Sequence, residues 1–175
     1  MVRGALNYAS EVLAQAADIT ITIFRCRLTT ILSLGYKSPG TGEMPATILI
    51  AEDYEDNREL LRLVLATAEY QVLEAANGRD CLKMARANRP DLIMIDLSMP
   101  GLDGWGVFRE LRADESTCEI PCIAITAHAE ADRARALVTG FSAYLTKPFR
   151  SAELLETVKD LLDKQALRTQ TRDTV

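Results

Sequence analysis

The chain has 175 residues, of which 48% are hydrophobic and 26% are charged, and its formal net charge is −5. This length allows one domain of ordinary size plus an appendage, and the apolar share is sufficient for a real core. The acidic balance argues against nonspecific binding to nucleic acid or to an anionic membrane, and the best candidate for a membrane span, residues 19–34, is interrupted by two arginines.

Residues 1–45 differ in pattern from the rest of the chain. Residues 6–17 carry apolar side chains at helical spacing, whereas residues 19–23 alternate Ile with Thr as in a strand. A connector rich in Ser, Pro and Gly follows at residues 38–42. We expect an N-terminal extension that is partly helical or disordered, and the open alternative is that these residues precede a true start at Met44.

From Thr47 onward, short apolar runs alternate with amphipathic segments. This alternation predicts βα units and an α/β fold with a doubly wound, five-stranded parallel sheet that has helices on both faces. The predicted strands are residues 47–51, 72–75, 91–96, 120–126 and 143–146. The predicted helices are residues 56–68, 78–87, 104–113, 130–138 and 151–163, and the polar residues 165–175 are expected to form a flexible tail.

The segment Asp91–Asp96 is central to this pattern. Its apolar run, Leu92–Ile95, predicts a strand buried on both faces, and Pro100 and Gly101 then require a loop. Asp96 is therefore expected at the carboxyl end of a central strand, which is where ligands bind in open α/β sheets. For Asp96 taken alone, the alternative is an ordinary turn residue.

Other polar side chains follow the neighbouring strands at the same edge of the sheet. Glu52 and Asp53 come after the first strand, while Thr126 ends the fourth and Lys147 follows the fifth. Three carboxylates this close together repel one another, and a divalent cation with hard oxygen ligands, best Mg²⁺, is the natural neutraliser. Mg²⁺, a lysine and a hydroxyl around a carboxylate are the parts that stabilise a transferring phosphoryl group. The pattern therefore predicts nucleophilic attack by Asp96, which would give an aspartyl phosphate.

In this order, the motifs resemble a response-regulator receiver domain, the phosphoacceptor module of two-component signalling and phosphorelays. The resemblance covers residues 46–164 and implies a flavodoxin-like sheet with strand order 2-1-3-4-5. The matching motifs are spread over the whole domain: Glu52-Asp53, Asp96 with Met99-Pro100 and Asp103-Gly104, Thr126-Ala127, Tyr144, and Lys147-Pro148-Phe149.

The resemblance implies a role for each acidic position. Asp96 would accept the phosphoryl group from a phosphohistidine on a histidine kinase or a histidine phosphotransfer protein. Asp96, Asp53 and the backbone carbonyl of Ser98 would be metal ligands for Mg²⁺, and Glu52 would act through a water. Glu52 departs from the family's more usual Asp, which keeps the ligand charge but makes the geometry of the metal site less certain.

The resemblance also implies a switch. Thr126 and Lys147 would hold phosphoryl oxygens, and the Lys147–Pro148 peptide bond would be cis. Inward movement of Thr126 would vacate space into which the ring of Tyr144, the family's switch aromatic, can turn. The fourth helix, the fifth strand and the last helix would then present a changed face to a downstream protein partner.

Functions from other classes use similar parts. A haloacid-dehalogenase-like phosphatase also has an aspartyl nucleophile, but it needs a second Asp two residues later, where this chain has Ser98. A flavodoxin needs a first loop that cradles a phosphate, whereas residues 52–56 are acidic and lack glycine. Within the receiver family, the open alternatives are a fragment of a larger hybrid kinase and a receiver that signals without phosphorylation.

We therefore predict a stand-alone receiver that phosphorylates and dephosphorylates itself but is not an enzyme for an external metabolite. No nucleic acid or membrane partner is expected. The cysteines form no C-x-x-C pair, which predicts reduced, mostly buried thiols in a cytoplasmic protein; they are Cys26, Cys81, Cys118 and Cys122. The single histidine, His128, is expected to be a solvent-facing loop residue.

Overall fold

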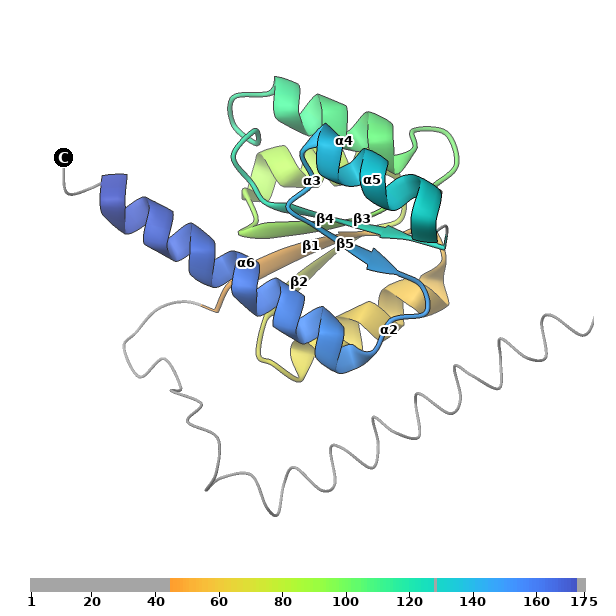
Figure 1. Ribbon diagram of the computed structural model, residues 1–175, viewed down its shortest axis with the longest axis horizontal. Helices are drawn as coiled ribbons and strands as arrows, with labels where there is room; N and C mark the ends of the chain where they lie inside the picture. The colour runs from red at the N-terminus through yellow and green to blue at the C-terminus, as the bar shows by residue number, and fades with distance from the viewer. Residues whose placement is uncertain (1–44, 128, 173–175) are drawn as a thin grey trace, which may run out of the picture. The chain divides into compact units, whose positions relative to one another are not determined.

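The computed structural model describes residues 45–127 and 129–172 (Figure 1). The predictions made for residues 1–44, for Cys26, for His128 and for residues 173–175 lie outside this part of the chain. The strands are β1 (Thr47–Ala51), β2 (Gln71–Ala75), β3 (Leu92–Asp96), β4 (Cys122–Thr126) and β5 (Ala143–Thr146). The helices are α2 (Glu55–Ala66), α3 (Gly78–Asn88), α4 (Gly104–Ala113), α5 (Ala129–Thr139) and α6 (Ser151–Arg172).

The five strands form one parallel sheet in the order β2-β1-β3-β4-β5. Helices α3, α4 and α5 cover one face of the sheet, and helices α2 and α6 cover the other (Figure 1). This arrangement confirms the predicted α/β fold, its doubly wound character and its strand order. Every residue of β3 and β4 is buried, as expected for central strands that have helices on both sides.

The strand register brings the predicted site residues to one edge of the sheet. Ala51 pairs with Ile95, Asp96 pairs with Ile125, and Thr126 pairs with Thr146. The last residues of four strands therefore lie at nearly the same level along the strand direction. Because the strands are parallel, this level is the carboxyl edge, and the loops after β1, β3, β4 and β5 all leave the sheet there.

Two helix starts are fixed by short polar side chains. The Oδ1 atom of Asn77 accepts a hydrogen bond from the backbone N–H of Asp80 at 2.9 Å, which caps α3. The Oδ1 atom of Asp103 accepts one from the N–H of Gly106 at 2.7 Å, which caps α4. Helix α2 differs, because Tyr54 at its N-cap position makes no side-chain capping bond.

The element bounds correct the sequence predictions in places. Strand β4 begins at Cys122 rather than at residue 120, because Pro121 has no N–H to donate to a strand ladder. Helix α6 continues to Arg172 rather than ending near Asp163. Residues 164–172 contain no Gly or Pro and include good helix formers, so nothing in the sequence terminates the helix earlier.

The described cysteines are free thiols. Cys81 and Cys122 are buried and Cys118 is half-buried. Burial raises the pKa of the Cys81 thiol to about 12 and that of Cys122 to about 11, so both remain protonated and inert at neutral pH. Among the described helices, none combines the length and the apolar character that crossing a membrane requires.

Candidate functional site

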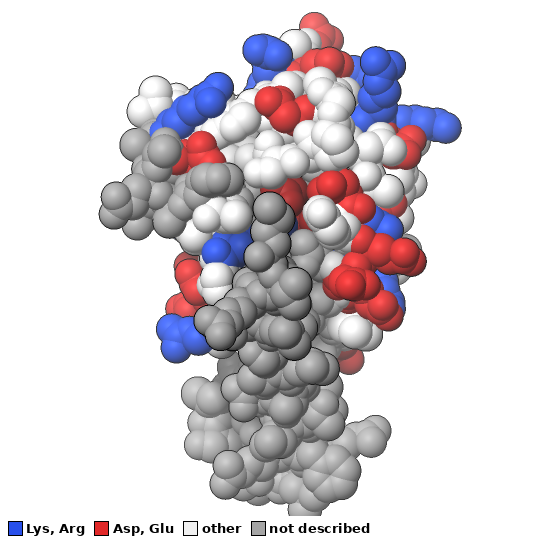
Figure 2. All heavy atoms as spheres, turned by 90° about the vertical axis from the view of Figure 1, so that its right-hand side faces the viewer, with Lys and Arg blue, Asp and Glu red and all other residues white. Residues whose placement is uncertain are grey.

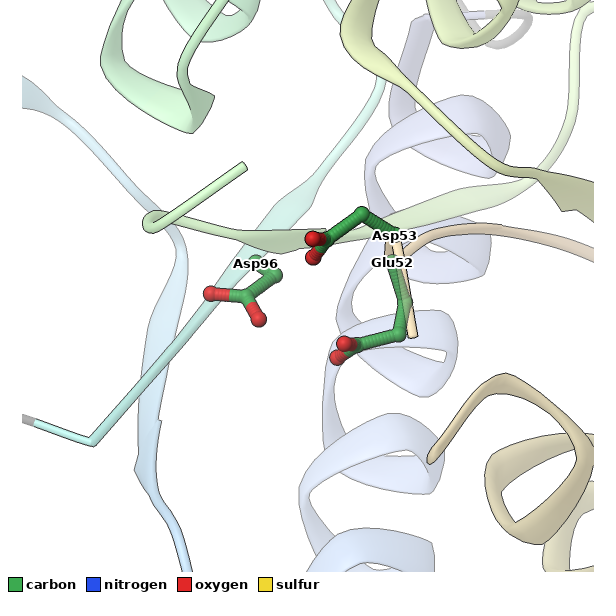
Figure 3. Close-up of side chains that lie close together, drawn as sticks. All are labelled: Glu52, Asp53 and Asp96. Atoms are coloured by element: carbon green, nitrogen blue, oxygen red, sulfur yellow. The ribbon is translucent and has the colours of Figure 1, made fainter. Parts of the chain in front are cut away.

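Three carboxylates meet at the carboxyl edge of the sheet (Figure 3). Glu52 and Asp53 follow β1 and Asp96 ends β3, and one oxygen from each lies within 4.8 Å of the others. Glu52 is 1% exposed and Asp96 is 5% exposed, whereas Asp53 is half-buried. Figure 2 views the side of the molecule toward which the strands run in Figure 1 and shows acidic side chains gathered on it. The arrangement concentrates negative charge in a poorly hydrated place, which a cation would relieve.

Asp96 is held by a backbone donor and a side-chain cation. Its Oδ1 atom accepts a hydrogen bond from the N–H of Ser98 at 2.8 Å, and its Oδ2 atom lies 2.6 Å from the Nζ atom of Lys147. Ser98 itself is exposed in the loop that follows β3. Both carboxylate oxygens of Asp96 are therefore oriented by the protein.

Gly104 allows the first turn of α4 to lie directly against the peptide that follows Asp96. A Cβ atom at this position would lie 2.4 Å from the carbonyl oxygen of Asp96 and 2.8 Å from the Cα atom of Leu97. Both obstacles are backbone atoms, which cannot rotate aside. Glycine at this position is thus required by the close approach of α4 to the end of β3.

Lys147 joins the two most buried acids. Its Nζ atom lies 2.6 Å from Glu52 Oε2 as well as 2.6 Å from Asp96 Oδ2. Burial alone lowers the pKa of this ammonium, but its hydrogen bonds to Asp96 and Glu52 outweigh that effect and raise the pKa above its usual value. Lys147 therefore stays charged at neutral pH. The peptide bond between Lys147 and Pro148 is cis.

Both carboxylate oxygens of Glu52 contact protein donors. Its Oε2 atom pairs with Lys147, while its Oε1 atom accepts hydrogen bonds from the N–H of Tyr54 at 3.3 Å and from Asn57 Nδ2 at 3.2 Å. Burial raises the pKa of Glu52, and the bond from Lys147 acts in the opposite direction. Glu52 therefore contacts a backbone N–H, an asparagine and a lysine at once. Sequence reasoning missed Asn57, which carries no motif by itself.

The switch residues predicted from the sequence lie on the adjacent strands. Thr126 is fully buried at the end of β4, and its Oγ1 atom donates a hydrogen bond to Asp132 Oδ2 at 3.0 Å. Tyr144 is half-buried on β5, where it pairs with Ala124 and packs against the core. Asp132, on α5, was not singled out from the sequence, because only the fold brings it to Thr126.

The donor set fits a hard divalent cation. The converging groups are oxygen atoms from three carboxylates, and no histidine or thiol of the described residues belongs to the cluster. Mg²⁺ is typically bound through one or two carboxylates, keeps several waters and accepts phosphate oxygens. The geometry could thus hold Mg²⁺ and a phosphoryl group together beside Asp96.

Comparison with known proteins decides the family. A family model described as the response regulator receiver domain matches residues 48–159. This chain belongs to the receiver family. Receiver domains are phosphoacceptors of two-component signalling, so this chain is a signalling protein rather than a classical enzyme. Members bind Mg²⁺ at an acidic pocket and interact with histidine kinases or phosphotransfer proteins and with downstream partners.

Curated receiver proteins resemble the chain along most of the described domain. The polar-differentiation response regulator DivK of Brucella anthropi is 37% identical over 120 residues, which cover 68% of this chain and 98% of DivK. The response regulator PleD of Caulobacter vibrioides is 40% identical over 119 residues, which cover 67% of this chain but 26% of PleD. The match therefore extends over nearly all of DivK and about a quarter of PleD.

Solved receiver structures superpose on the same region. A putative response regulator from Chloroflexus aurantiacus has a TM-score of 0.66 and 34% identity, covering 69% of this chain and 99% of its own. The receiver domain of the sensor histidine kinase PA1611 from Pseudomonas aeruginosa has a TM-score of 0.64 and 34% identity, with the same coverage. That structure is described as having a magnesium ion coordinated in the active site cleft.

Proposed function

We propose that Asp96 is the residue of this chain that accepts the phosphoryl group. The observation that carries the proposal is the pairing of a buried, strand-end carboxylate with Lys147, 2.6 Å away, inside a cluster of three acids. Such a carboxylate is oriented by its hydrogen bonds and has a positive charge beside it, as an activated nucleophile needs. The phosphohistidine donor is a histidine kinase or a histidine phosphotransfer protein.

The transfer replaces one bond to phosphorus by another. An oxygen of Asp96 bonds to phosphorus as the bond between phosphorus and the donor imidazole breaks. Lys147 and the hydroxyl of Thr126 then hold the phosphoryl oxygens, where positioned charge and hydrogen bonds stabilise the transition state. Hydrolysis of the aspartyl phosphate by water returns the free carboxylate, so the chain performs its own phosphorylation and dephosphorylation chemistry.

The ligands that we propose for Mg²⁺ are the carboxylates of Asp53 and Asp96 and the backbone carbonyl of Ser98. When bound, the ion supplies positive charge that offsets the carboxylates and the phosphoryl oxygens. Glu52 is assigned an indirect role through a water, as the resemblance to receiver domains implies.

The output is a change in a protein-binding face. Thr126 leaves Asp132 when it turns toward the phosphoryl group, and Tyr144 turns into the space behind it. Helices α5 and α6 and strand β5 then offer a changed surface to a protein partner, with no role for nucleic acid or membrane. A cytoplasmic location, expected from the unpaired cysteines, stays a prediction.

The resemblance to DivK supports a receiver that acts by itself, with residues 46–164 as the receiver domain and residues 1–45 as an extension. The resemblance to the receiver domains of PleD and of the kinase PA1611 supports the second candidate, a receiver within a longer phosphorelay protein. Both candidates predict phosphorylation at Asp96.

Intact mass spectrometry after incubation with acetyl phosphate and Mg²⁺ tests the assignment. Wild type should gain one phosphoryl group, and Asp96→Asn, which keeps the shape but removes the nucleophile, should gain none. Asp91→Asn is the matched control, because Asp91 is an exposed Asp immediately before the start of β3, whereas Asp96 ends that strand. Phosphorylation of Asp96→Asn at the wild-type rate would contradict the proposal.

A further inference from the structure

The backbone that carries Glu52 and Asp53 leaves the sheet and enters α2 without a capping side chain. Its carbonyl groups need donors, because buried backbone oxygens are almost always hydrogen-bonded. Arg58, in the first turns of α2, supplies them. Its Nη1 atom donates to the carbonyl oxygen of Glu52 at 2.8 Å and approaches that of Asp53 at 3.4 Å.

Arg58 is itself held from the neighbouring strand. Its Nε atom lies 3.5 Å from Glu74 Oε2 on β2, and its side chain is only 15% exposed. The periodicity of α2 predicts Arg58 outside the apolar face of the helix. Its guanidinium nevertheless points toward the segment that carries Glu52 and Asp53, which we call the acidic loop. The guanidinium of Arg58 therefore links Glu74 on β2 to the backbone carbonyls of Glu52 and Asp53.

We propose that Arg58, braced by Glu74, is a positioning residue for the acidic loop. By fixing the carbonyls of Glu52 and Asp53, it sets the direction in which both carboxylates leave the backbone and hence their approach to Asp96. The proposal rests on the proposed function, in which these acids serve Mg²⁺ binding and phosphorylation. Arginine suits the task because its planar fork can donate to several acceptors at fixed angles.

Charge and geometry predict opposite effects for Arg58. Its positive charge near the acids would repel a divalent cation, so on charge alone its removal should strengthen Mg²⁺ binding. If Arg58 positions the loop, its removal should weaken Mg²⁺ binding despite the loss of that repulsion. The sign of the change therefore separates the two roles.

The chain offers a matched control on the same helix. Arg62 carries the same charge, and its Nε atom also lies 3.5 Å from Glu74, but its ion pairs are to Glu74 and Glu59 and not to the loop carbonyls. Arg58→Ala and Arg62→Ala thus remove the same charge and one partner of the same glutamate. Only Arg58→Ala also removes the hydrogen-bond donor to the carbonyls of Glu52 and Asp53.

The experiment is a calorimetric titration of the full chain with MgCl₂, together with phosphorylation by acetyl phosphate at saturating Mg²⁺. Arg58→Ala should weaken Mg²⁺ binding about tenfold, as is usual when a group that supports metal ligands is lost. Arg62→Ala should bind as wild type does. Arg58→Lys should recover only part of the affinity, because one ammonium cannot reach both carbonyls and Glu74. Saturating Mg²⁺ should restore most of the phosphorylation rate of Arg58→Ala.

Circular dichroism melting without Mg²⁺ shows whether each variant is folded, and Arg58→Lys provides the test if Arg58→Ala is not. Equal affinity in Arg58→Lys and wild type, or tighter binding in Arg58→Ala, would overturn the positioning role. Failure of the proposed function would look different: wild type itself would bind no Mg²⁺, or Asp96→Asn would still be phosphorylated.

Discussion

The site has two parts whose side chains are held in different ways. We call Glu52, Asp96 and Lys147 the acceptor side, and Thr126, Asp132 and Tyr144 the switch side. On the acceptor side, Lys147 joins Glu52 and Asp96 with two contacts of 2.6 Å, so the charged groups hold one another. On the switch side, Thr126 donates its hydroxyl to Asp132 on α5, outside the acidic cluster. Under the proposed roles, the groups for phosphoryl transfer are already assembled, whereas Thr126 has to leave Asp132 before it can contact the phosphoryl group. Mutations should therefore affect phosphorylation and output separately.

The largest effect on the acceptor side is expected from Lys147→Met, which keeps most of the length of the side chain and removes its charge. Glu52 and Asp96 would lose their shared counter-ion, and breaking a buried pair in this way costs about 3 to 5 kcal/mol. Urea unfolding without Mg²⁺ should show this loss, and adding Mg²⁺ should raise the melting temperature more than it does for wild type. Unchanged stability without Mg²⁺ would mean that the acceptor side does not depend on this pairing.

A smaller effect is expected from Gly104→Ala, which tests the close contact between the first turn of α4 and the backbone after β3. The added methyl group would meet backbone atoms of Asp96 and Leu97, and such overpacking costs about 1 to 3 kcal/mol. Gly106→Ala is the control, since the nearest atom to its methyl group would be the flexible end of Leu102 and since Ala favours helix. Urea denaturation should show a loss for Gly104→Ala and little or none for Gly106→Ala. Equal stabilities would contradict this close contact.

The smallest effect is expected on the switch side, from Asp132→Ala. Removing the acceptor of the Thr126 hydroxyl should favour the state in which Thr126 turns toward the phosphoryl group, because a hydrogen bond contributes about 0.5 to 1.5 kcal/mol net. Beryllofluoride, a phosphoryl mimic, should then bind several-fold more tightly, with the rate of phosphorylation by acetyl phosphate little changed. Weaker beryllofluoride binding would mean that Asp132 supports the active state instead.

The acceptor side was more predictable from the sequence than its supports. Apolar runs predicted where the strands end, and parallel strands place those ends at one edge, so Glu52, Asp96 and Lys147 followed from chain order alone. The contacts of Asn57, Arg58 and Asp132 depend on how far a side chain reaches across a loop, which periodicity does not encode. The end of α6 was missed for a simpler reason, since no Gly or Pro marks it.

The central claim, a fixed acceptor side beside a movable switch side, is tested most directly by amide hydrogen exchange with and without beryllofluoride and Mg²⁺. In wild type, protection should change across α5 and β5, while β1 and β3 should keep theirs. Thr126→Ala should bind the mimic but lose most of the change in α5 and β5, because the hydroxyl that carries the movement is gone. The same protection across α5 and β5 in both states of wild type would contradict this account.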